Sequence, residues 1–400
     1  MDWREWAKKN DAERDNKPEA LSDLFVLDMS YANLSGSFAA ATLAEYGATV
    51  LKIEPSSGDP ARNFTPDALT AGGVGLSYLS EARNKHSIRL DLASGSDIDY
   101  LKSLMSHADV VIETSKPGWL YEKGLSYFQA REVNKRLVWC SIYTYGQYGP
   151  LASCGQEDSD IVDQAISGMM YINGEMEDKN DPKDYQVPTK FGNQMAWYTG
   201  GAWASFGIMT ALHYRSSTGI GQMIDISPAE GFGRISNASA SYHFCTGETL
   251  ERLGSHDASV FPYTYFPAKD CTAFIAAFSD INWKKFCYVM KREDLTGLST
   301  HDRLQSENMQ ILWKEISKWT ENLTYDEILK EIKKADEKGI PGVIVPAKVL
   351  TPIETFNDNN SWERDILRRV DLHDGSYTIL ANQAVHATET PPRIKWVETK

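Results

Sequence analysis

The sequence predicts an α/β fold, with a Rossmann-like large domain built on a parallel sheet and a smaller α/β domain. Short apolar runs alternate with helix-like segments through the first half of the chain, which is the pattern of repeated βαβ units. After about residue 262 the texture changes to strands followed by amphipathic, charge-rich helices. At 400 residues, the chain is long enough for two domains, each with its own core.

The first βαβ unit comprises a buried strand at residues 24–28, an alanine-rich helix at 35–46 opened by a Ser35 cap, and a strand at 48–53. The pattern returns with a helix at 95–107 and strands at 87–92, 109–113, 136–142 and 222–227. Residues 196–214 are nearly all apolar, so this helix is expected to lie buried at the centre of the domain.

The domain boundaries follow from these textures. Residues 1–230 and 339–400 are expected to form the large Rossmann-like domain, 231–261 a linker, and 262–338 the small α/β domain. The small domain is expected to hold strands at 263–266 and 273–277 and helices at 283–291, 308–318 and 325–335.

Several classes of site are disfavoured. The first strand-to-helix turn, from Tyr31 to Ser37, lacks the G-x-G-x-x-G of dinucleotide sites, and the chain has no P-loop. A formal charge of −14 disfavours nucleic-acid and anionic-membrane partners. The five cysteines are widely spaced, so neither a zinc site nor a disulfide framework is indicated, and a reducing cytoplasm is expected. No signal peptide or transmembrane run is recognised.

A series of segments resembles the class III CoA-transferases. They follow the family order over residues 26–345: V-L-D at 26–28, L-A-E-Y-G-A-T-V-L-K-I-E at 43–54, G-D-P-A-R at 58–62, N-K-H-S-I at 84–88, E-T-S-K-P-G at 113–118, G-Q-Y-G-P at 146–150, Q-A-I-S-G at 164–168, T-G-I-G-Q at 218–222 and G-I-P-G at 339–342.

The resemblance implies that each subunit is an open ring and that two rings interlock as a dimer. It also implies that the substrates are CoA thioesters and small carboxylic acids, with no covalently bound cofactor and no metal.

Class III transfer needs an ionised carboxylate. The carboxylate attacks the donor thioester to give a mixed anhydride, is converted by the released CoA thiolate to an enzyme thioester, and then passes CoA to the acceptor acid. In the family this residue is an aspartate after a glycine, ahead of the long apolar helix. Here Asn193 follows Gly192, and a neutral amide cannot form the anhydride. No catalytic residue is therefore assigned to this chain, which alone is expected to be inactive.

Two other readings concern the same position. A misaligned loop would make Asp181, Asp184 or another nearby acid the nucleophile, but the match at Gly192 and the following helix argues against it. The family's racemases use a histidine before an aspartate, where this chain has Ser159-Asp160, so proton exchange between two bases is rejected.

The resemblance makes four residues candidates for CoA binding. Lys116 matches a basic family position and Tyr145 an aromatic one, while Arg62 and Lys85 are candidates for the phosphates. For each of them, taken singly, a solvated surface position is at least as good an explanation.

A subunit without the nucleophile makes sense beside an aspartate-bearing paralogue. The pattern is most similar to the non-catalytic subunits of two-subunit family members, in particular those that transfer CoA from succinyl-CoA to (R)-benzylsuccinate in toluene degradation. Two alternatives stay open: a self-sufficient homodimer with another nucleophile, and a pseudoenzyme that binds CoA esters.

Overall fold

The computed structural model describes residues 2, 4–5, 8, 13–176, 186–236 and 239–399. Two compact units divide the chain: the first comprises residues 1–170, 190–237 and 358–400, and the second 171–189 and 238–357. The second unit contains the whole predicted range 262–338 and extends beyond it. Backbone bonds explain part of this extension, since Gly254 donates to the carbonyl of Gly174 and Thr189 to that of Asn173.

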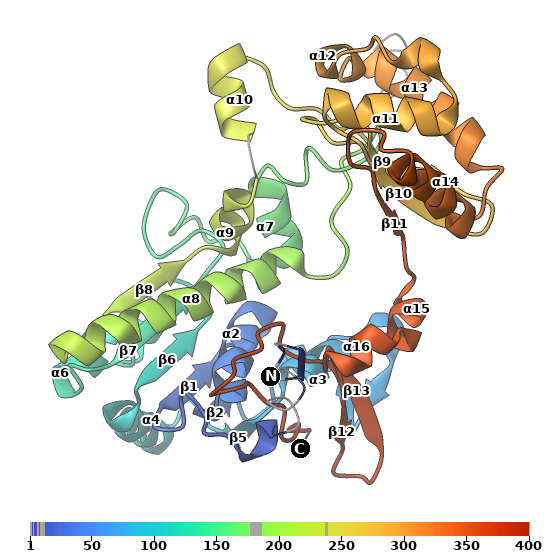
Figure 1. The fold of residues 1–400 in the computed structure, drawn as a ribbon. Coiled ribbons are helices and arrows are strands. Elements are labelled where there is room, and N and C mark those ends of the chain that lie inside the picture. Colours follow the sequence, from blue (N-terminus) through green and yellow to red (C-terminus); the bar gives the residue numbers. More distant parts are fainter. Residues whose placement is uncertain are drawn as a thin grey trace. The chain divides into compact units, whose positions relative to one another are not determined.

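The α/β prediction is confirmed by a six-stranded, all-parallel sheet in the first unit, with the strand order β5-β2-β1-β6-β7-β8 (Figure 1). Its strands are β1 (Phe25–Met29), β2 (Thr49–Glu54), β5 (Lys85–Arg89), β6 (Val110–Glu113), β7 (Val138–Ile142) and β8 (Met223–Ile226). The chain builds the sheet outward from β1 in one direction and then from β6 in the other. The switch point in strand order therefore lies between β1 and β6.

Helices cover both faces of this sheet. The helices of the first unit that precede residue 235 are α2 (Leu34–Glu45), α3 (Leu76–Glu81), α4 (Gly95–His107), α5 (Trp119–Glu122), α6 (Tyr127–Val133), α7 (Asp160–Ile166), α8 (Met195–Thr218) and α9 (Pro228–Arg234). Alternate strand residues point to opposite faces, so Val26 packs with α2 and α8 while Leu27 packs with α4 and α6. Short strands β3 (Thr70–Ala71) and β4 (Val74–Gly75) form a separate hairpin.

Two sequence predictions about helices need correction. The cap of α2 is Asn33 rather than Ser35, because the Asn33 side chain accepts a hydrogen bond of 2.8 Å from the backbone N–H of Ser35. The long helix α8 was expected to be buried all round. Only one stripe of α8 packs on the sheet, including Ala204 and Ile208, whereas Phe206 on another side is 66% exposed.

The second unit has a three-stranded antiparallel sheet of order β11-β10-β9. Its elements are α10 (Ser239–Thr246), β9 (Tyr263–Pro267), β10 (Thr272–Ala276), α11 (Asp280–Met290), α12 (Thr300–Arg303), α13 (Ser306–Thr320), α14 (Tyr325–Glu337), β11 (Val345–Lys348) and α15 (Pro352–Asn357). Trp283 on α11, Leu312 on α13 and Ile328 on α14 share one core with the strands. This amphipathic packing is what the charge-rich helical pattern predicts.

The C-terminal segment, residues 358–400, belongs to the first unit. It holds α16 (Asn359–Glu363), β12 (Leu367–Asp371) and β13 (Tyr377–Ala381). Leu380 and Val397 pack in one cluster with Leu34 and Tyr78, and the Arg393 guanidinium donates to the carbonyls of residues 14, 15 and 17. The last residues of the chain therefore complete the core that the first residues begin. None of the described helices is long and apolar enough to cross a bilayer.

Candidate functional site

The switch point between β1 and β6 is flanked by the loops that follow these two strands. In open parallel sheets, ligands bind in the crevice at the carboxyl ends of the strands at this point. The loop after β1 ends at Asn33, and the loop after β6 runs from Thr114 to Gly118. The two loops are tied together by a 3.0 Å hydrogen bond from the backbone N–H of Tyr31 to Thr114 Oγ1.

Residues 156–158 lie against these loops and contact two of the predicted CoA residues. Lys116 Nζ lies 2.6 Å from Glu157 Oε1, and the Tyr145 hydroxyl donates to Gln156 Oε1 at 2.7 Å. Asn33 Nδ2 donates to Asp158 Oδ2 at 3.3 Å. The structure thus places Lys116 and Tyr145 beside the same short segment. Because the Lys116–Glu157 pair is solvent-exposed, it is weak and exchangeable.

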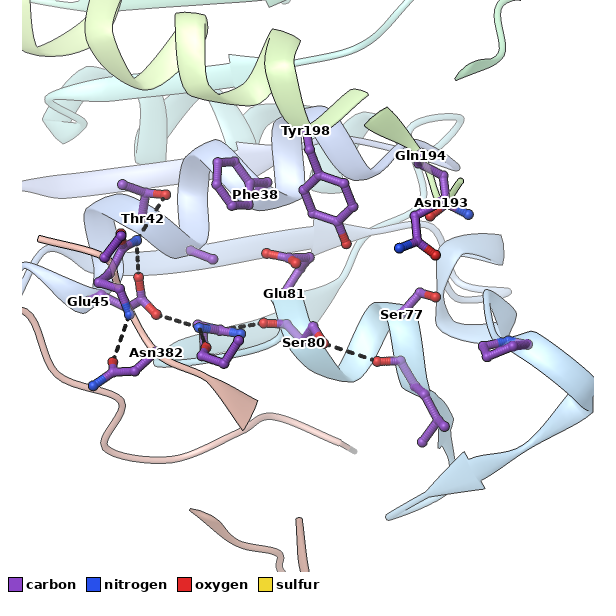
Figure 2. A pocket seen from close by; sticks show the side chains of 17 residues that line it. Phe38, Thr42, Glu45, Ser77, Ser80, Glu81, Asn193, Gln194, Tyr198 and Asn382 are labelled. Carbon is purple, nitrogen blue, oxygen red and sulfur yellow. Dashed lines mark hydrogen bonds and ion pairs between the residues drawn. The ribbon is translucent and has the colours of Figure 1, made fainter. Parts of the chain in front are cut away.

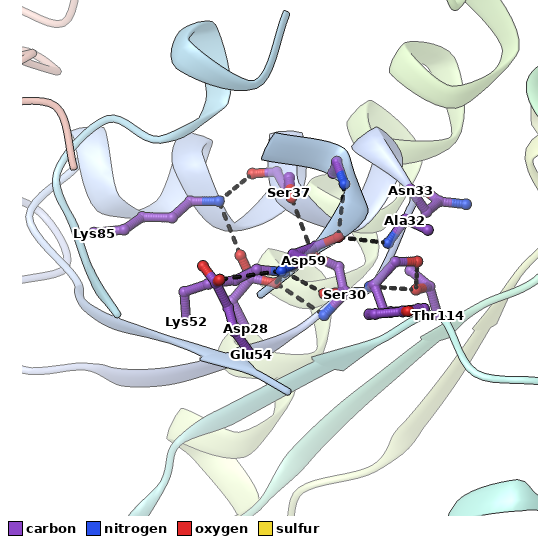
Figure 3. A network of polar contacts seen from close by, with 12 residues as sticks. Asp28, Ser30, Ala32, Asn33, Ser37, Lys52, Glu54, Asp59, Lys85 and Thr114 are labelled. Atoms are coloured by element: carbon purple, nitrogen blue, oxygen red, sulfur yellow. Dashed lines mark hydrogen bonds and ion pairs between the residues drawn. The ribbon is translucent and has the colours of Figure 1, made fainter. Parts of the chain in front are cut away.

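Lys85, a third predicted CoA residue, lies in a buried ion network formed with side chains of β1, β2 and the loop after β2 (Figure 3). Lys85 Nζ contacts Asp28 Oδ2 at 2.9 Å and donates to the carbonyl of Ser37 at 2.8 Å. Lys52 Nζ lies 2.9 Å from Asp59 Oδ2. Burial by itself would raise the pKa of Asp28, but the charges of Lys52 and Lys85 outweigh burial and hold this pKa below its usual range.

Arg62 also has an internal partner. Its guanidinium forms two-pronged contacts with the Glu54 carboxylate, the shortest at 2.7 Å, and lies over the ring of Tyr78. A phosphate would have to compete with Glu54 for Arg62 and with buried Asp28 for Lys85, and breaking a buried pair is costly. The role of both residues in CoA binding stays a prediction.

Asn193 lies in a loop that α7 holds at two points. The Gln164 amide oxygen accepts from the backbone N–H of Phe191 at 2.8 Å, and Asp160 Oδ1 accepts from that of Trp197 at 3.0 Å. Gln164 Nε2 donates to Asp160 Oδ2 at 2.7 Å, which links the two contacts. Between them Asn193 has a left-handed φ of 55°, a conformation that asparagine tolerates better than most residues.

Asp160 thereby does the work of a helix cap for α8, whose own N-cap residue Gln194 makes no side-chain capping bond. The sequence analysis did not identify Asp160 or Gln164 as residues that position Asn193. Both residues lie in segments discussed above: Gln164 begins the Q-A-I-S-G segment, and Asp160 follows Ser159. Only the fold shows that this segment meets the start of α8.

One turn further along α7, Asp163 is fully buried and has no cationic partner among the described residues. Burial, reinforced by the charges of Asp158 and Asp160, raises the pKa of Asp163 to about 7. Both carboxyl oxygens of Asp163, Thr144 Oγ1 and Trp197 Nε1 are buried without a well-directed hydrogen bond. The sequence carried no signal for this cluster, because its members are distant along the chain.

A cavity of about 560 Å³ opens beside Asn193 (Figure 2). Residues of α2, α3, the start of α8 and the segment 381–384 line it. The cation among its described lining residues, Arg83, already has two partners. Arg83 Nη1 lies 2.7 Å from Glu45 Oε1 and donates to the carbonyl of Ala381 at 2.8 Å. Glu81 adds a second carboxyl group, buried to 5% exposure. Among the described residues that line it, the cavity therefore has no uncommitted cation for an anionic substrate.

From the sequence, Asp181 and Asp184 are alternative nucleophiles, and no metal is expected. Asp181 and Asp184 lie outside the residues that the structure describes. Within the described ranges, no group of three or more His, Cys, Asp or Glu side chains is arranged to hold a metal ion. Asp160 is a described carboxylate that meets the start of α8, through the backbone N–H of Trp197.

Comparison with known proteins gives one consistent family. Residues 21–398 match the model of CoA-transferase family III. The chain is 31% identical to a succinyl-CoA:mesaconate CoA-transferase of Haloarcula marismortui, over 93% of this chain and 91% of that protein. It is 30% identical to a succinyl-CoA–L-malate CoA-transferase beta subunit of Chloroflexus aurantiacus, over 90% and 86%. A CAIB/BAIF family protein from Brucella suis has the same fold, with a TM-score of 0.78 at 23% identity over 96% and 97% of the two chains.

Proposed function

Since the chain belongs to CoA-transferase family III, we propose that it is the subunit without the nucleophile in a two-subunit enzyme that moves CoA from succinyl-CoA to a short dicarboxylic acid. In this proposal its partner is a paralogue with an aspartate at the position of Asn193, and the two chains interlock. The partner's carboxylate forms the anhydride and the enzyme thioester, and this chain supplies structure and part of the substrate channel.

The observation that carries the proposal is the state of Asn193. Its uncharged amide cannot attack a thioester, and the cavity beside it offers no free cation among its described lining residues. Succinyl-CoA and dicarboxylic acids are anionic, so a turnover site for them needs cations that this cavity does not supply. Both properties fit a chain that accompanies catalysis rather than performing it.

The names of the relatives support the proposed class of acceptor acid. The relatives named above act on mesaconate and L-malate, both short dicarboxylic acids. The second is a beta subunit, so it is one of at least two kinds of subunit in its enzyme. Benzylsuccinate, which the sequence analysis favoured, is a substituted succinate and belongs to the same chemical class. We propose that CoA meets this subunit beside Lys116 and Tyr145 at the switch point.

The test is transfer by the separate and combined chains. The purified chain, mixed with succinyl-CoA and a panel of mesaconate, malate and benzylsuccinate, is expected to give no new CoA ester by liquid chromatography. Addition of an aspartate-bearing paralogue encoded beside it is expected to give transfer and a complex by size-exclusion chromatography. Robust transfer by this chain alone would sink the proposal.

One observation favours a second candidate, a self-sufficient enzyme. Asp160 brings a carboxylate to the start of α8, in the loop of Asn193. If Asp160 were the nucleophile, hydroxylamine would trap an acyl group on this chain, and Asp160→Asn would abolish trapping. Absence of a trapped adduct in the wild-type chain excludes this candidate.

A further inference from the structure

The cavity beside Asn193 contains a buried carboxyl group that the proposed function does not use. Glu81, the last residue of α3, points toward the same space as the Tyr198 hydroxyl in Figure 2. The Tyr198 hydroxyl is the side-chain hydrogen-bond partner of Glu81. No Lys or Arg in the described part of the chain forms an ion pair with Glu81, since Arg83 pairs with Glu45. The charges of Arg83 and Lys85 reach Glu81 without forming an ion pair with it, so they offset only part of the cost of burying its carboxylate.

The described charged residues that line the cavity are Glu45, Glu81 and Arg83, so their formal charges sum to one negative charge. Glu45 is matched by Arg83 and also accepts a hydrogen bond from the Gln383 amide. The segment 381–384 carries no charged residue, and Asn193 and Gln194 are neutral. Glu81 is therefore the acid without an ion pair among the described lining residues, since its nearest cations, Arg83 and Lys85, pair with Glu45 and Asp28. An anionic ligand would be repelled, whereas a ligand with one positive charge would complete the balance.

The rest of the lining suits the same ligand. The rings of Phe38 and Tyr198 both line the cavity and meet edge to face, with centroids 5.3 Å apart. Aromatic faces attract organic cations, most strongly when water is excluded. The side-chain amides of Asn193, Gln194 and Asn382 add oxygen acceptors for N–H groups.

We propose that this cavity binds one small organic cation, with an alkylammonium or guanidinium head, held by the Glu81 carboxylate, the Tyr198 and Phe38 rings and the neighbouring amide oxygens. The proposal goes beyond CoA transfer and does not depend on it. It assigns a ligand site to the place from which the nucleophilic carboxylate is missing.

Cation binding in this cavity is expected to be coupled to the protonation of Glu81. Burial raises the pKa of Glu81, and the charges of Arg83 and Lys85 oppose this rise. A bound cation lowers the pKa of Glu81, so binding is coupled to proton release and becomes tighter with rising pH over the range in which Glu81 titrates. Glu45 and Arg83 are the other charged groups among the described residues that line the cavity. The Tyr198 hydroxyl stays protonated, because burial raises its pKa above the usual value of a tyrosine.

The experiment is isothermal titration of the purified chain, without CoA esters or a partner. The probes are ethylammonium, tetramethylammonium and methylguanidinium, with succinate as an anionic comparison. We expect saturable binding of at least one cation, proton release in buffers of different ionisation enthalpy, and none with succinate. The three cations separate a need for N–H donors from attraction to the rings alone.

Three variants locate the site. Glu81→Gln is expected to weaken binding by about tenfold or more, because a charge-assisted contact is lost. Gln194→Lys puts an ammonium at the cavity and is expected to block the probes. Glu132→Gln, which removes an exposed charge from α6, is expected to leave binding unchanged. Circular dichroism melting confirms that each variant is folded.

The proposal is overturned if the folded wild-type chain binds none of the three cations, or if folded Glu81→Gln binds them as the wild type does. It is also overturned if succinate displaces a bound cation from the cavity. None of these results bears on CoA transfer, which is measured with a different partner and substrate.

Discussion

Two sets of buried acids in the first unit differ in whether they form ion pairs. At the ends of β1 and β2, Asp28 and Asp59 face the ammonium groups of Lys52 and Lys85, and the pKa of Asp28 is held low. Near the start of α8, Asp163 and Glu81 are also buried but form no ion pair among the described residues, and burial raises the pKa of both, in Glu81 against the opposing charges of Arg83 and Lys85. Burial alone therefore does not decide the charge of a carboxyl group. The matched set joins β1, β2 and β5, whereas the unmatched set is expected to bind protons.

The largest expected effect breaks the matched set. Lys85→Ala removes the nearer partner of Asp28 and leaves a buried carboxylate facing only Lys52, which is expected to lower the free energy of unfolding by about 3–5 kcal/mol. Urea unfolding followed by tryptophan fluorescence measures it. The matched variant is Lys116→Ala, whose exposed ion pair is expected to contribute less than about 1 kcal/mol. Equal losses in the two variants would contradict the comparison.

The next effect tests the unmatched set through pH. Unfolded Asp163 ionises near its model value of 3.8, whereas folded Asp163 keeps its proton until about pH 7. Folding thus takes up a proton between these values, and the free energy of unfolding falls as pH rises from about 4 to 7. Asp163→Asn removes this penalty and is expected to raise stability at pH 8 by roughly 2–4 kcal/mol while changing it little at pH 4.

The readout for Asp163→Asn is the urea midpoint at several pH values. Asp99→Asn serves as the control, because the Asp99 side chain is 81% exposed and its removal is expected to leave the pH slope unchanged. A wild-type slope that survives Asp163→Asn would mean that another group takes up the proton.

A smaller effect concerns the contact between α7 and α8. Asp160→Ala deletes the acceptor of the Trp197 N–H and is expected to cost about 0.5–2 kcal/mol, as loss of a helix cap does. Limited proteolysis is expected to cut residues 186–194 faster in this variant. Unchanged cleavage would show that Gln164 alone holds the loop.

The smallest effect is at Asn193 itself. Because its φ is positive, Asn193→Gly is expected to change the free energy of unfolding by less than about 1 kcal/mol, whereas a β-branched residue is strained there. Asn193→Val is accordingly expected to destabilise by about 1–2 kcal/mol. Thermal melting of the pair distinguishes backbone strain from loss of the amide. If valine is tolerated as well as glycine, the loop does not hold this conformation.

Local pattern was sufficient for much of the fold. The helix predicted at 95–107 is α4 to the residue, and each strand predicted for the large sheet lies within three residues of the observed strand at either end. Periodicity of apolar residues carries this information. It did not identify the cap of α2, because Asn33 and Ser35 are both good cap residues and only the backbone angle of residue 33 separates them.

The site was less accessible from the sequence. The resemblance drew attention to Lys116 and Tyr145, which the fold places beside one segment, but charge and spacing cannot reveal that Lys85 is buried against Asp28, which lies 57 residues earlier. Partners of this kind are set by strand order. The same holds for Asp163, whose pKa depends on Thr144, Asp158 and Asp160 meeting it in space.

The way the C-terminal segment joins the first unit constrains how the protein is made. Leu380 and Val397 fill a cluster shared with Leu34 and Tyr78, and Arg393 holds the carbonyls of residues 14, 15 and 17. During synthesis, this core stays incomplete until the ribosome has released almost the whole chain, whereas residues 238–357 have emerged earlier with a core of their own. The order of translation therefore favours the second unit as the first to fold, and a chain stopped short of residue 397 leaves part of the cluster around Leu34 and Tyr78 uncovered for chaperones to bind.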